Sequence, residues 1–151
     1  MGEHDPIQVH GLNHFFGAGD ARKQVIFDIN LTIAKGSLTI LMGPSGSGKT
    51  TLLTLIGALR DVQEGSVGVL AKKLRDADAT VLVQLRQRLG FIFQAHNLHE
   101  SLTATQNVLM GLQVHGKGNA AKQREAAHHM LDLFGLSNRR DYMPGNLSGG
   151  Q

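Results

Sequence analysis

The first third of the chain alternates between hydrophobic and polar positions, a pattern typical of strands with one buried face. Residues 7 to 16 alternate loosely and end in two phenylalanines, whereas residues 25 to 33 alternate more regularly. Together the two runs predict an antiparallel sheet. The side chains expected on one face of the second strand are Val25, Phe27, Ile29, Leu31 and Ile33.

Two short apolar runs do not alternate, and this predicts strands that are buried on both faces. They are Leu-Thr-Ile-Leu-Met at residues 38 to 42 and Leu-Gly-Phe-Ile-Phe at residues 89 to 93. Between them, residues 67 to 70 predict a short strand. Residues 78 to 88 predict a helix whose basic residues lie toward its C-terminal end, where they suit the helix dipole.

Apolar residues recur at helical spacing in three stretches. Residues 52 to 59 follow the first buried run, and residues 103 to 112 and 120 to 134 follow the second. We therefore expect two parts. Residues 1 to 94 combine antiparallel strands with a strand, loop and helix core, and residues 95 to 151 form a helical subdomain.

The segment between the first buried run and the next helix reads Gly-Pro-Ser-Gly-Ser-Gly-Lys-Thr, the G-x-x-x-x-G-K-T pattern of a phosphate-binding loop. Such a loop curls backbone N–H groups around a polyphosphate, which requires positive φ angles and close approach. Gly43, Gly46 and Gly48 permit both. Because strand, loop and helix occur in the required order, a glycine-rich turn with a stray lysine is a poor alternative.

Positive potential from different sources converges on this loop. The Lys49 ammonium faces the β- and γ-phosphates, and the helix that begins here directs the positive end of its dipole at the same phosphates. The Thr50 hydroxyl is a ligand for Mg²⁺. The loop therefore predicts the binding of a nucleotide with Mg²⁺. The predicted nucleotide-binding residues are Gly43, Pro44, Ser45, Gly46, Ser47, Gly48, Lys49, Thr50 and Thr51.

Composition narrows the class of protein. The 151 residues are 41% hydrophobic and 18% charged, which is ordinary for a globular domain with a core. Fifteen Lys and Arg against twelve Asp and Glu give a net charge of +3 with no long block of like charge, so we expect no nucleic-acid partner. Cysteine is absent, which fits a reducing compartment. The start lacks an apolar signal core, and we expect a cytoplasmic chain.

The final pentapeptide makes the nucleotide-binding interpretation more specific. Leu147 to Gln151 reads Leu-Ser-Gly-Gly-Gln, which matches the signature of ATP-binding cassette (ABC) transporters. The Phe-Ile-Phe-Gln element that ends at Gln94 resembles the Q-loop of that family. The phosphate loop, the Q-loop element and the signature follow one another between residues 43 and 151 in the same order as in that family. The chain therefore resembles about the first two thirds of an ABC transporter ATPase subunit.

Finer similarities lie around the loop and after Gln94. Residues 43 to 59, 94 to 99 and 101 to 103 resemble the lipoprotein-release and macrolide-efflux group, and within it the DevA-type subunits of heterocyst-glycolipid exporters. The resemblance implies an α/β P-loop NTPase fold. Such a fold has a RecA-like core, an antiparallel β subdomain and a helical subdomain, and the C-terminal part of the core would be missing from these 151 residues.

The resemblance also implies roles for single residues. Phe16 stacks on the adenine of ATP, with Phe15 as the alternative one position earlier. Gln94 reaches Mg²⁺ and the attacking water, which makes it catalytic together with Lys49, and residues 95 to 112 face a transmembrane permease. The signature residues Leu147, Ser148, Gly149, Gly150 and Gln151 contact ATP held by a second subunit, which implies a dimer. Taken alone, this pentapeptide is equally compatible with a helix N-terminus that a serine caps.

A protein of this kind is expected on the inner face of the plasma membrane, held there by its permease. There ATP hydrolysis drives the export of a lipid-like or hydrophobic substrate, and a periplasmic adaptor belongs to some such systems.

The aspartate, glutamate and histidine that the family needs for hydrolysis would all follow Gln151. We therefore expect a part of a longer gene product that is inactive alone. The alternatives are a non-hydrolysing ATP-binding or interaction module and, less well supported, a small-molecule kinase.

Overall fold

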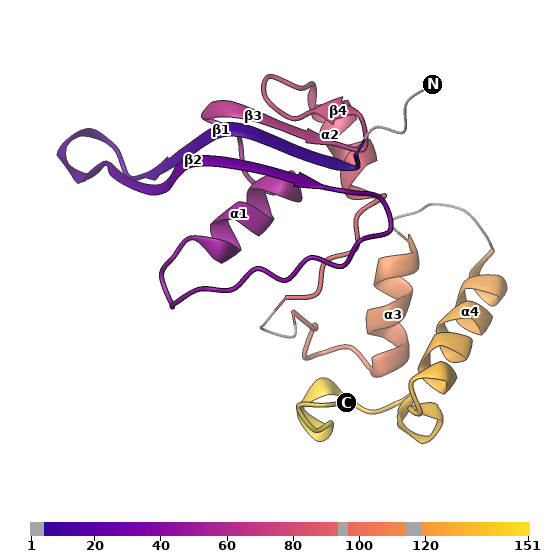
Figure 1. Ribbon diagram of the computed structural model, residues 1–151. Coiled ribbons are helices and arrows are strands. Elements are labelled where there is room, and N and C mark those ends of the chain that lie inside the picture. Colours follow the sequence, from indigo (N-terminus) through magenta and orange to yellow (C-terminus); the bar gives the residue numbers. More distant parts are fainter. Residues whose placement is uncertain (1–4, 94–96, 114–118) are drawn as a thin grey trace. The chain divides into compact units, whose positions relative to one another are not determined.

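The computed structural model describes residues 5 to 93, 97 to 113 and 119 to 151. They belong to two compact units, Met1–Phe91 and Ile92–Gln151. The first unit holds a sheet with two helices, and the second holds two longer helices and short turns (Figure 1). The elements are β1 (Ile7–Phe16), η1 (Gly19–Ala21), β2 (Lys23–Ile33), α1 (Lys49–Ile56), β3 (Glu64–Val69), β4 (Lys72–Lys73), α2 (Ala79–Arg86), α3 (Ala104–Gln113), α4 (Ala120–Leu133), η2 (Ser137–Arg139) and η3 (Pro144–Asn146).

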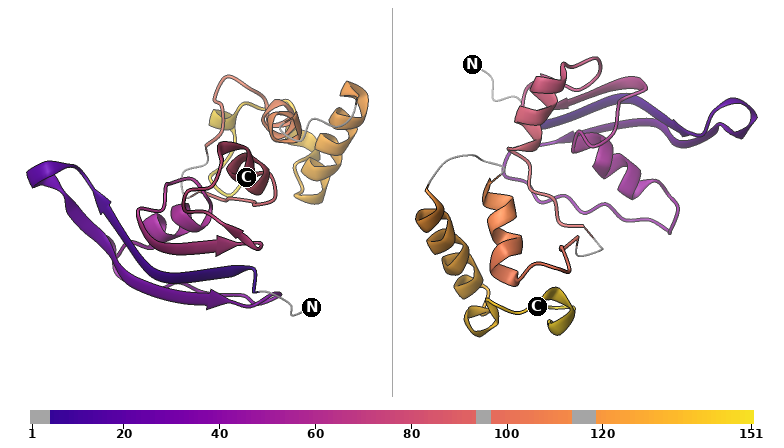
Figure 2. Two further views of the ribbon diagram at one scale, coloured as in Figure 1. Left: turned by 90° about the horizontal axis from the view of Figure 1, so that it is seen from above. Right: turned by 180° about the vertical axis from the view of Figure 1, so that it is seen from behind.

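The sheet of the first unit is antiparallel, with the strand order β2-β1-β3-β4. Along β1 and β2, Ile7 lies opposite Ile33 and Phe16 lies opposite Lys23. This hairpin extends past the shorter strands β3 and β4 (Figure 2). The antiparallel sheet predicted from the alternating pattern is confirmed.

One face of β2 differs from the prediction. Phe27 is 64% exposed, whereas its neighbour Ile26 is 3% exposed and belongs to the core. The cause is an irregularity at Asp28, which has a φ of +44° and donates its backbone N–H to the Asn13 side chain at 2.9 Å. The β1–β2 register shifts at this point. Because one added residue reverses which side chains face inward, the expectation for Phe27 was wrong.

Helix α1 covers one face of this sheet (Figure 1). Its buried side chains Leu52, Leu55 and Ile56 join buried residues of the strands, among them Leu12 and Val67, in one hydrophobic cluster. Burial of each such side chain contributes about 1.5–3 kcal/mol to folding. The helix predicted after the glycine-rich loop is therefore confirmed, and its packing fixes the end of that loop against the sheet.

Neither of the two predicted buried strands forms. Residues 38 to 42 and 89 to 93 have no strand conformation, and Leu38, Met42 and Ile92 are 91%, 83% and 101% exposed. A strand buried on both faces needs ladder partners and covering layers. Among the described residues only the antiparallel sheet is present, and no strand of it pairs with either segment. Both segments are apolar, but the neighbouring strands and covering layers that a buried strand needs are not among the described residues.

The second unit is helical, as predicted. Helices α3 and α4 lie side by side (Figure 2), with Ala127 and Leu131 of α4 buried. A capping box begins α3, in which the Thr103 N–H donates to the Gln106 side chain at 2.8 Å and the Gln106 N–H donates to the Thr103 hydroxyl at 3.3 Å. At the start of α4, the side chain of Asn119 accepts a hydrogen bond from the first turn.

The Asn107 side chain fastens the segment before α3 to that helix. Its Oδ1 accepts from the His99 N–H at 2.8 Å, and its Nδ2 donates to the backbone carbonyls of His99, Leu102 and Thr103 at 3.0–3.2 Å. One amide group thus contacts four backbone groups, with its two N–H hydrogens shared among three carbonyls. Residues 99 to 103 owe their conformation largely to this side chain.

We expect Asn107→Ala to destabilise the second unit by about 2 kcal/mol, because several hydrogen bonds of a half-buried amide are lost together. Asn119→Ala, which removes a single helix cap, should cost about half as much. Tyr142 is the one tyrosine in a chain without tryptophan, so its fluorescence during urea unfolding reports on this unit. Equal effects of the two substitutions would contradict the central role given to Asn107.

Candidate nucleotide-binding site

The glycine-rich loop lies between the exposed 38–42 segment and α1. Gly46 and Gly48 have φ angles of +80° and +86°, which L-residues rarely adopt. A Cβ added at Gly48 would lie 2.8 Å from both Ile26 Cδ1 and the carbonyl oxygen of Val25. The loop therefore needs glycine at position 48 for two independent reasons, its backbone conformation and its close approach to β2.

Lys49 is held over the loop that precedes it. Its Nζ donates to the carbonyl oxygens of Gly43 at 2.8 Å and Pro44 at 2.7 Å, and to the Ser47 hydroxyl at 3.3 Å. The ammonium is thus placed inside the curve of the glycine-rich loop. A polyphosphate in this loop would meet a positive charge that is already positioned.

The N-terminus of α1 adds a second anion-binding element. The helix begins at Lys49, and its N-cap Gly48 provides no side chain to its first-turn N–H groups. Such N–H groups and the helix dipole favour an anion. The exposed Thr50 hydroxyl is available beside them as an oxygen ligand for Mg²⁺, a cation that commonly takes its other oxygens from phosphates and water.

The aromatic end of β1 lies near the same loop. Val25, which approaches Gly48, is flanked on β2 by Gln24 and Ile26, and these pair with Phe15 and His14 of β1. Phe16 follows directly on β1 and is 37% exposed, with the Arg60 guanidinium 4.9 Å from its ring centre. The Phe16 end of β1 is thus paired with the part of β2 that approaches the loop at Gly48.

Phe15 is placed differently from Phe16. It is half-buried, and the Arg22 guanidinium lies 3.8 Å from its ring centre. Its backbone is fixed by Gln63, whose Oε1 accepts from the Phe15 N–H at 2.8 Å and whose Nε2 donates to the Phe15 carbonyl at 3.1 Å. Of the two phenylalanines, Phe16 is therefore the more accessible to a base.

His14 is a buried polar residue that the sequence patterns did not single out. It is 4% exposed, and its Nδ1 has no hydrogen-bond partner among the described residues. Burial, and secondarily the charge of Arg60, lower the pKa of His14 below the usual 6.5. The imidazole is therefore neutral at neutral pH.

This lowered pKa predicts a loss of stability in mild acid. The unfolded chain takes up a proton at position 14 as the pH falls through 6.5, whereas the native state resists protonation. The melting temperature should therefore fall from about pH 7 to about pH 5, and His14→Phe should remove part of that fall. Circular dichroism melts of the two proteins across this range provide the measurement. Parallel curves would show that His14 does not carry the effect.

The signature residues lie in the second unit, after η3. Ser148, Gly149, Gly150 and Gln151 are exposed and form a turn in which the Gln151 N–H donates to the Ser148 carbonyl at 2.9 Å. The Ser148 N–H in turn donates to Gln151 Oε1 at 3.0 Å. Residues 148 to 151 thus form a single hydrogen-bonded turn.

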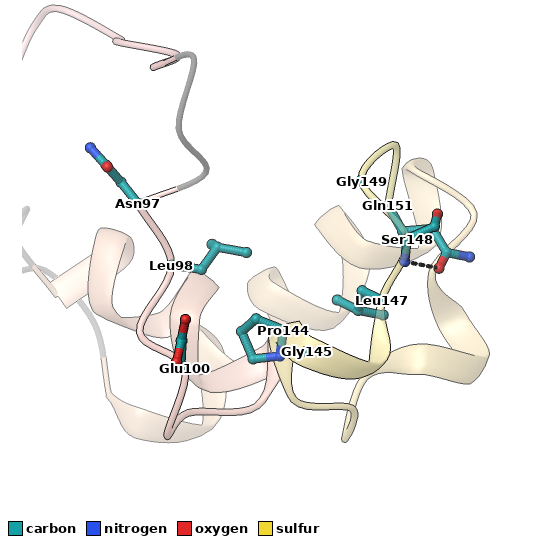
Figure 3. Close-up of a pocket in the computed structure, with 9 residues that line it drawn as sticks. All are labelled: Asn97, Leu98, Glu100, Pro144, Gly145, Leu147, Ser148, Gly149 and Gln151. Carbon is teal, nitrogen blue, oxygen red and sulfur yellow. Dashed lines mark hydrogen bonds between the residues drawn. The ribbon is translucent and has the colours of Figure 1, made fainter.

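A cavity of about 540 Å³ adjoins this turn (Figure 3). Residues from the segment before α3 form one part of its wall, and the residues from η3 onward form the other. The chain leading into η3 is tied to the start of α3, since the Ala104 N–H donates to the Tyr142 carbonyl and the Thr105 hydroxyl donates to the Arg140 carbonyl. The lining residues are Asn97, Leu98, Glu100, Pro144, Gly145, Leu147, Ser148, Gly149 and Gln151.

The predicted site residues thus fall into two groups. Phe16 and the residues from Gly43 to Thr51 belong to the first unit, and those from Leu147 to Gln151 belong to the second. Gln94, the predicted Q-loop residue, lies outside the described residues. Among the residues that are described, no helix is long and apolar enough to cross a membrane.

Comparison with known proteins shows which family combines these features. The family description "ABC transporter" matches residues 26 to 151, which include the phosphate loop and the signature. The chain belongs to the ABC transporter family. Its α/β fold is that of the P-loop ATP-binding domains of this family. A solved dimeric ATP-binding cassette bound to ADP and Pi matches 96% of this chain, with a TM-score of 0.86 and 33% sequence identity.

Curated relatives fall in the predicted group. The ABC domain is 41% identical over 147 residues to the macrolide export ATP-binding/permease protein MacB 1 of Aeromonas hydrophila, and 36% identical over 146 residues to the lipoprotein-releasing system ATP-binding protein LolD 1 of Caulobacter vibrioides. Both matches include 96% of the present chain, but only 22% of the first relative and 62% of the second. The chain covers 64% of the solved cassette. The narrower resemblance to DevA-type subunits remains a prediction.

Proposed function

We propose that this ABC domain binds Mg·ATP and, as part of a dimer, powers the export of a lipid-like or hydrophobic substrate through a separate permease. The observation that carries the proposal is the position of the Lys49 ammonium, held by the Gly43 and Pro44 carbonyls inside the loop that precedes α1. Relatives named for macrolide export and for lipoprotein release support the class of substrate.

In this proposal each predicted site residue outside the signature has a part in binding. The loop N–H groups and Lys49 hold the phosphates, the Thr50 hydroxyl ligates Mg²⁺, and Phe16 stacks on adenine. Gln94 contributes to the Mg²⁺ shell and to the position of the attacking water. Bound Mg²⁺ would offset the charge that develops on the phosphates during hydrolysis.

We propose that the signature acts on the nucleotide of a second subunit. Ser148, Gly149 and Gly150 are exposed, as an intersubunit contact requires of the free subunit. The similar solved cassettes are described as dimers. In mixed dimers, Ser148→Ala in one subunit should lower turnover at the site whose loop belongs to the other subunit. An effect confined to the loop of the mutated subunit would refute action in trans.

Hydrolysis is proposed for a subunit of the length of the LolD 1 relative, of which the present chain covers 62%. No apolar strand followed by Asp-Glu occurs in the present sequence, so the usual carboxylates of the family are not among these 151 residues. In a subunit of that length, we propose that further strands pair with residues 38 to 42 and cover their exposed side chains. A permease, and in some systems an adaptor, would complete the transporter at the inner face of the membrane.

Binding can be tested on the 151-residue chain itself. We expect Mg·ATP at millimolar concentration to raise its melting temperature, because a ligand that binds only the native state stabilises it by RT ln(1 + [L]/Kd). Mg·AMP, which lacks the β- and γ-phosphates, is the matched control and should have little effect. Equal shifts with both nucleotides would argue against a triphosphate site at Lys49.

The alternative proposal is a module that binds ATP but never hydrolyses it. The exposed apolar side chains of residues 38 to 42 and Ile92 bear on this choice, since a module that acts alone would leave them in water. ATPase activity of a subunit extended to the length of the LolD 1 relative, reconstituted with its permease, would exclude the alternative. Tight ATP binding without turnover in that assembly would favour it.

A further inference from the structure

His14 occupies a position that packing alone does not explain. It lies opposite Ile26 on the sheet face that α1 covers, and both side chains are buried. Its Nδ1 is buried and has no partner among the described residues, which is rare for a polar atom in a core. A leucine or phenylalanine would fill comparable space without leaving a nitrogen unpaired.

The neighbour that His14 does engage is Phe16. Their ring centres are 5.1 Å apart with an interplanar angle of 85°, an edge-to-face arrangement that is favourable for two aromatic rings. Arg60 lies 4.9 Å from the centre of the same Phe16 ring. Two side chains thus restrict the orientation of a ring that remains 37% exposed.

The backbone under this ring is restricted as well. Gln63 exchanges two hydrogen bonds with the backbone of Phe15, one residue before Phe16. Arg60 and Gln63 both come from the segment that follows α1, the helix that starts at the phosphate loop. The Phe16 ring is therefore held by groups from β1 and from the loop after α1, so that little conformational freedom is left to lose on stacking.

We propose that His14 is a positioning residue for Phe16, whose ring its imidazole holds in the orientation on which an adenine base stacks. This inference rests on the proposed binding of ATP with Phe16 as the stacking ring. The neutral state of His14 fits the role, because a charged imidazole would repel the Arg60 guanidinium that contacts the same ring.

The test separates binding of the base from binding of the phosphates. Affinities for Mg·ATP and for Mg·tripolyphosphate, which lacks base and sugar, are measured by calorimetry for the wild-type chain, His14→Leu and His14→Phe. We expect His14→Leu to weaken ATP binding by about threefold to tenfold and to leave tripolyphosphate binding within about twofold. His14→Phe, which keeps an aromatic ring, should retain most of the ATP affinity.

Each other outcome has a distinct meaning. Wild-type ATP affinity in His14→Leu would overturn the inference alone, and so would an equal loss for ATP and tripolyphosphate, which is the mark of a structural role. If the wild-type chain binds neither ligand, the proposed function fails and the inference fails with it. If His14→Leu does not fold, His14→Gln replaces it, because glutamine lacks the ring but keeps a polar group. The same changes in ATP and tripolyphosphate affinity are expected for His14→Gln.

Discussion

Lys49→Ala should weaken Mg·ATP binding by about tenfold to 100-fold, the factor that corresponds to a charge-assisted hydrogen bond of 1.5–3 kcal/mol. The ammonium lies where the loop and the N-terminus of α1 converge, and no other lysine or arginine belongs to the loop. The expected result is loss of the ATP-dependent rise in melting temperature. In an assembled transporter, the same change should abolish ATP-driven export while leaving assembly with the permease intact.

The control for this prediction is Lys72→Ala, which removes an equal charge from an exposed position on β4. Without ATP, both variants should melt within a few degrees of the wild-type chain, since Lys49 hydrogen-bonds only to exposed loop groups. Wild-type ATP affinity in Lys49→Ala would refute the role of this lysine. Equal loss in both variants would indicate a general effect of net charge.

Gly48→Ala should destabilise the first unit by about 2–4 kcal/mol and also abolish nucleotide binding. The added methyl group would lie 2.8 Å from Ile26 Cδ1 and from the Val25 carbonyl oxygen, at a φ of +86°. The carbonyl belongs to the β2 backbone and cannot rotate away. Relief would require α1 to move from the sheet, which would uncover Leu52 and Leu55. The midpoint of urea unfolding, followed by circular dichroism, measures the cost.

Gly46→Ala is the matched control for Gly48→Ala. Gly46 has nearly the same φ, +80°, but a Cβ there meets nothing within 4 Å. It should therefore cost only the conformational strain of about 1–2 kcal/mol. A difference between the two variants isolates the contact with β2 from the strain that they share. Similar costs would mean that the loop shifts freely and is not fixed against the sheet.

The elements that depend on local patterns were predictable from the sequence. The periodicity of residues 103 to 112 and 120 to 134 predicted α3 and α4, because a helix satisfies its own backbone hydrogen bonds. The glycine-rich loop and α1 followed from the motif. The strands expected at 38 to 42 and 89 to 93 failed for the opposite reason, since a strand needs partners that its own sequence does not supply.

The details that failed or were missed depend on contacts between distant residues. Phe27 points outward because Asn13 accepts the Asp28 N–H and stabilises a bulge, which no alternation pattern reveals. His14 looks like an ordinary polar position in a loosely alternating strand. Asn107 resembles any exposed helix residue until its four backbone partners are seen. A search for polar residues within otherwise apolar faces would have found the histidine.

The exposed 38–42 segment leaves the phosphate loop anchored at one end. Its α1 end is packed in the core, whereas the residues that lead into Gly43 pair with no described strand. Amide hydrogen exchange should therefore be slow in α1 and fast from residue 38 up to the start of that helix. Binding of ATP by this chain should show an unfavourable entropy, because the ligand has to immobilise the unpaired residues that lead into the phosphate loop.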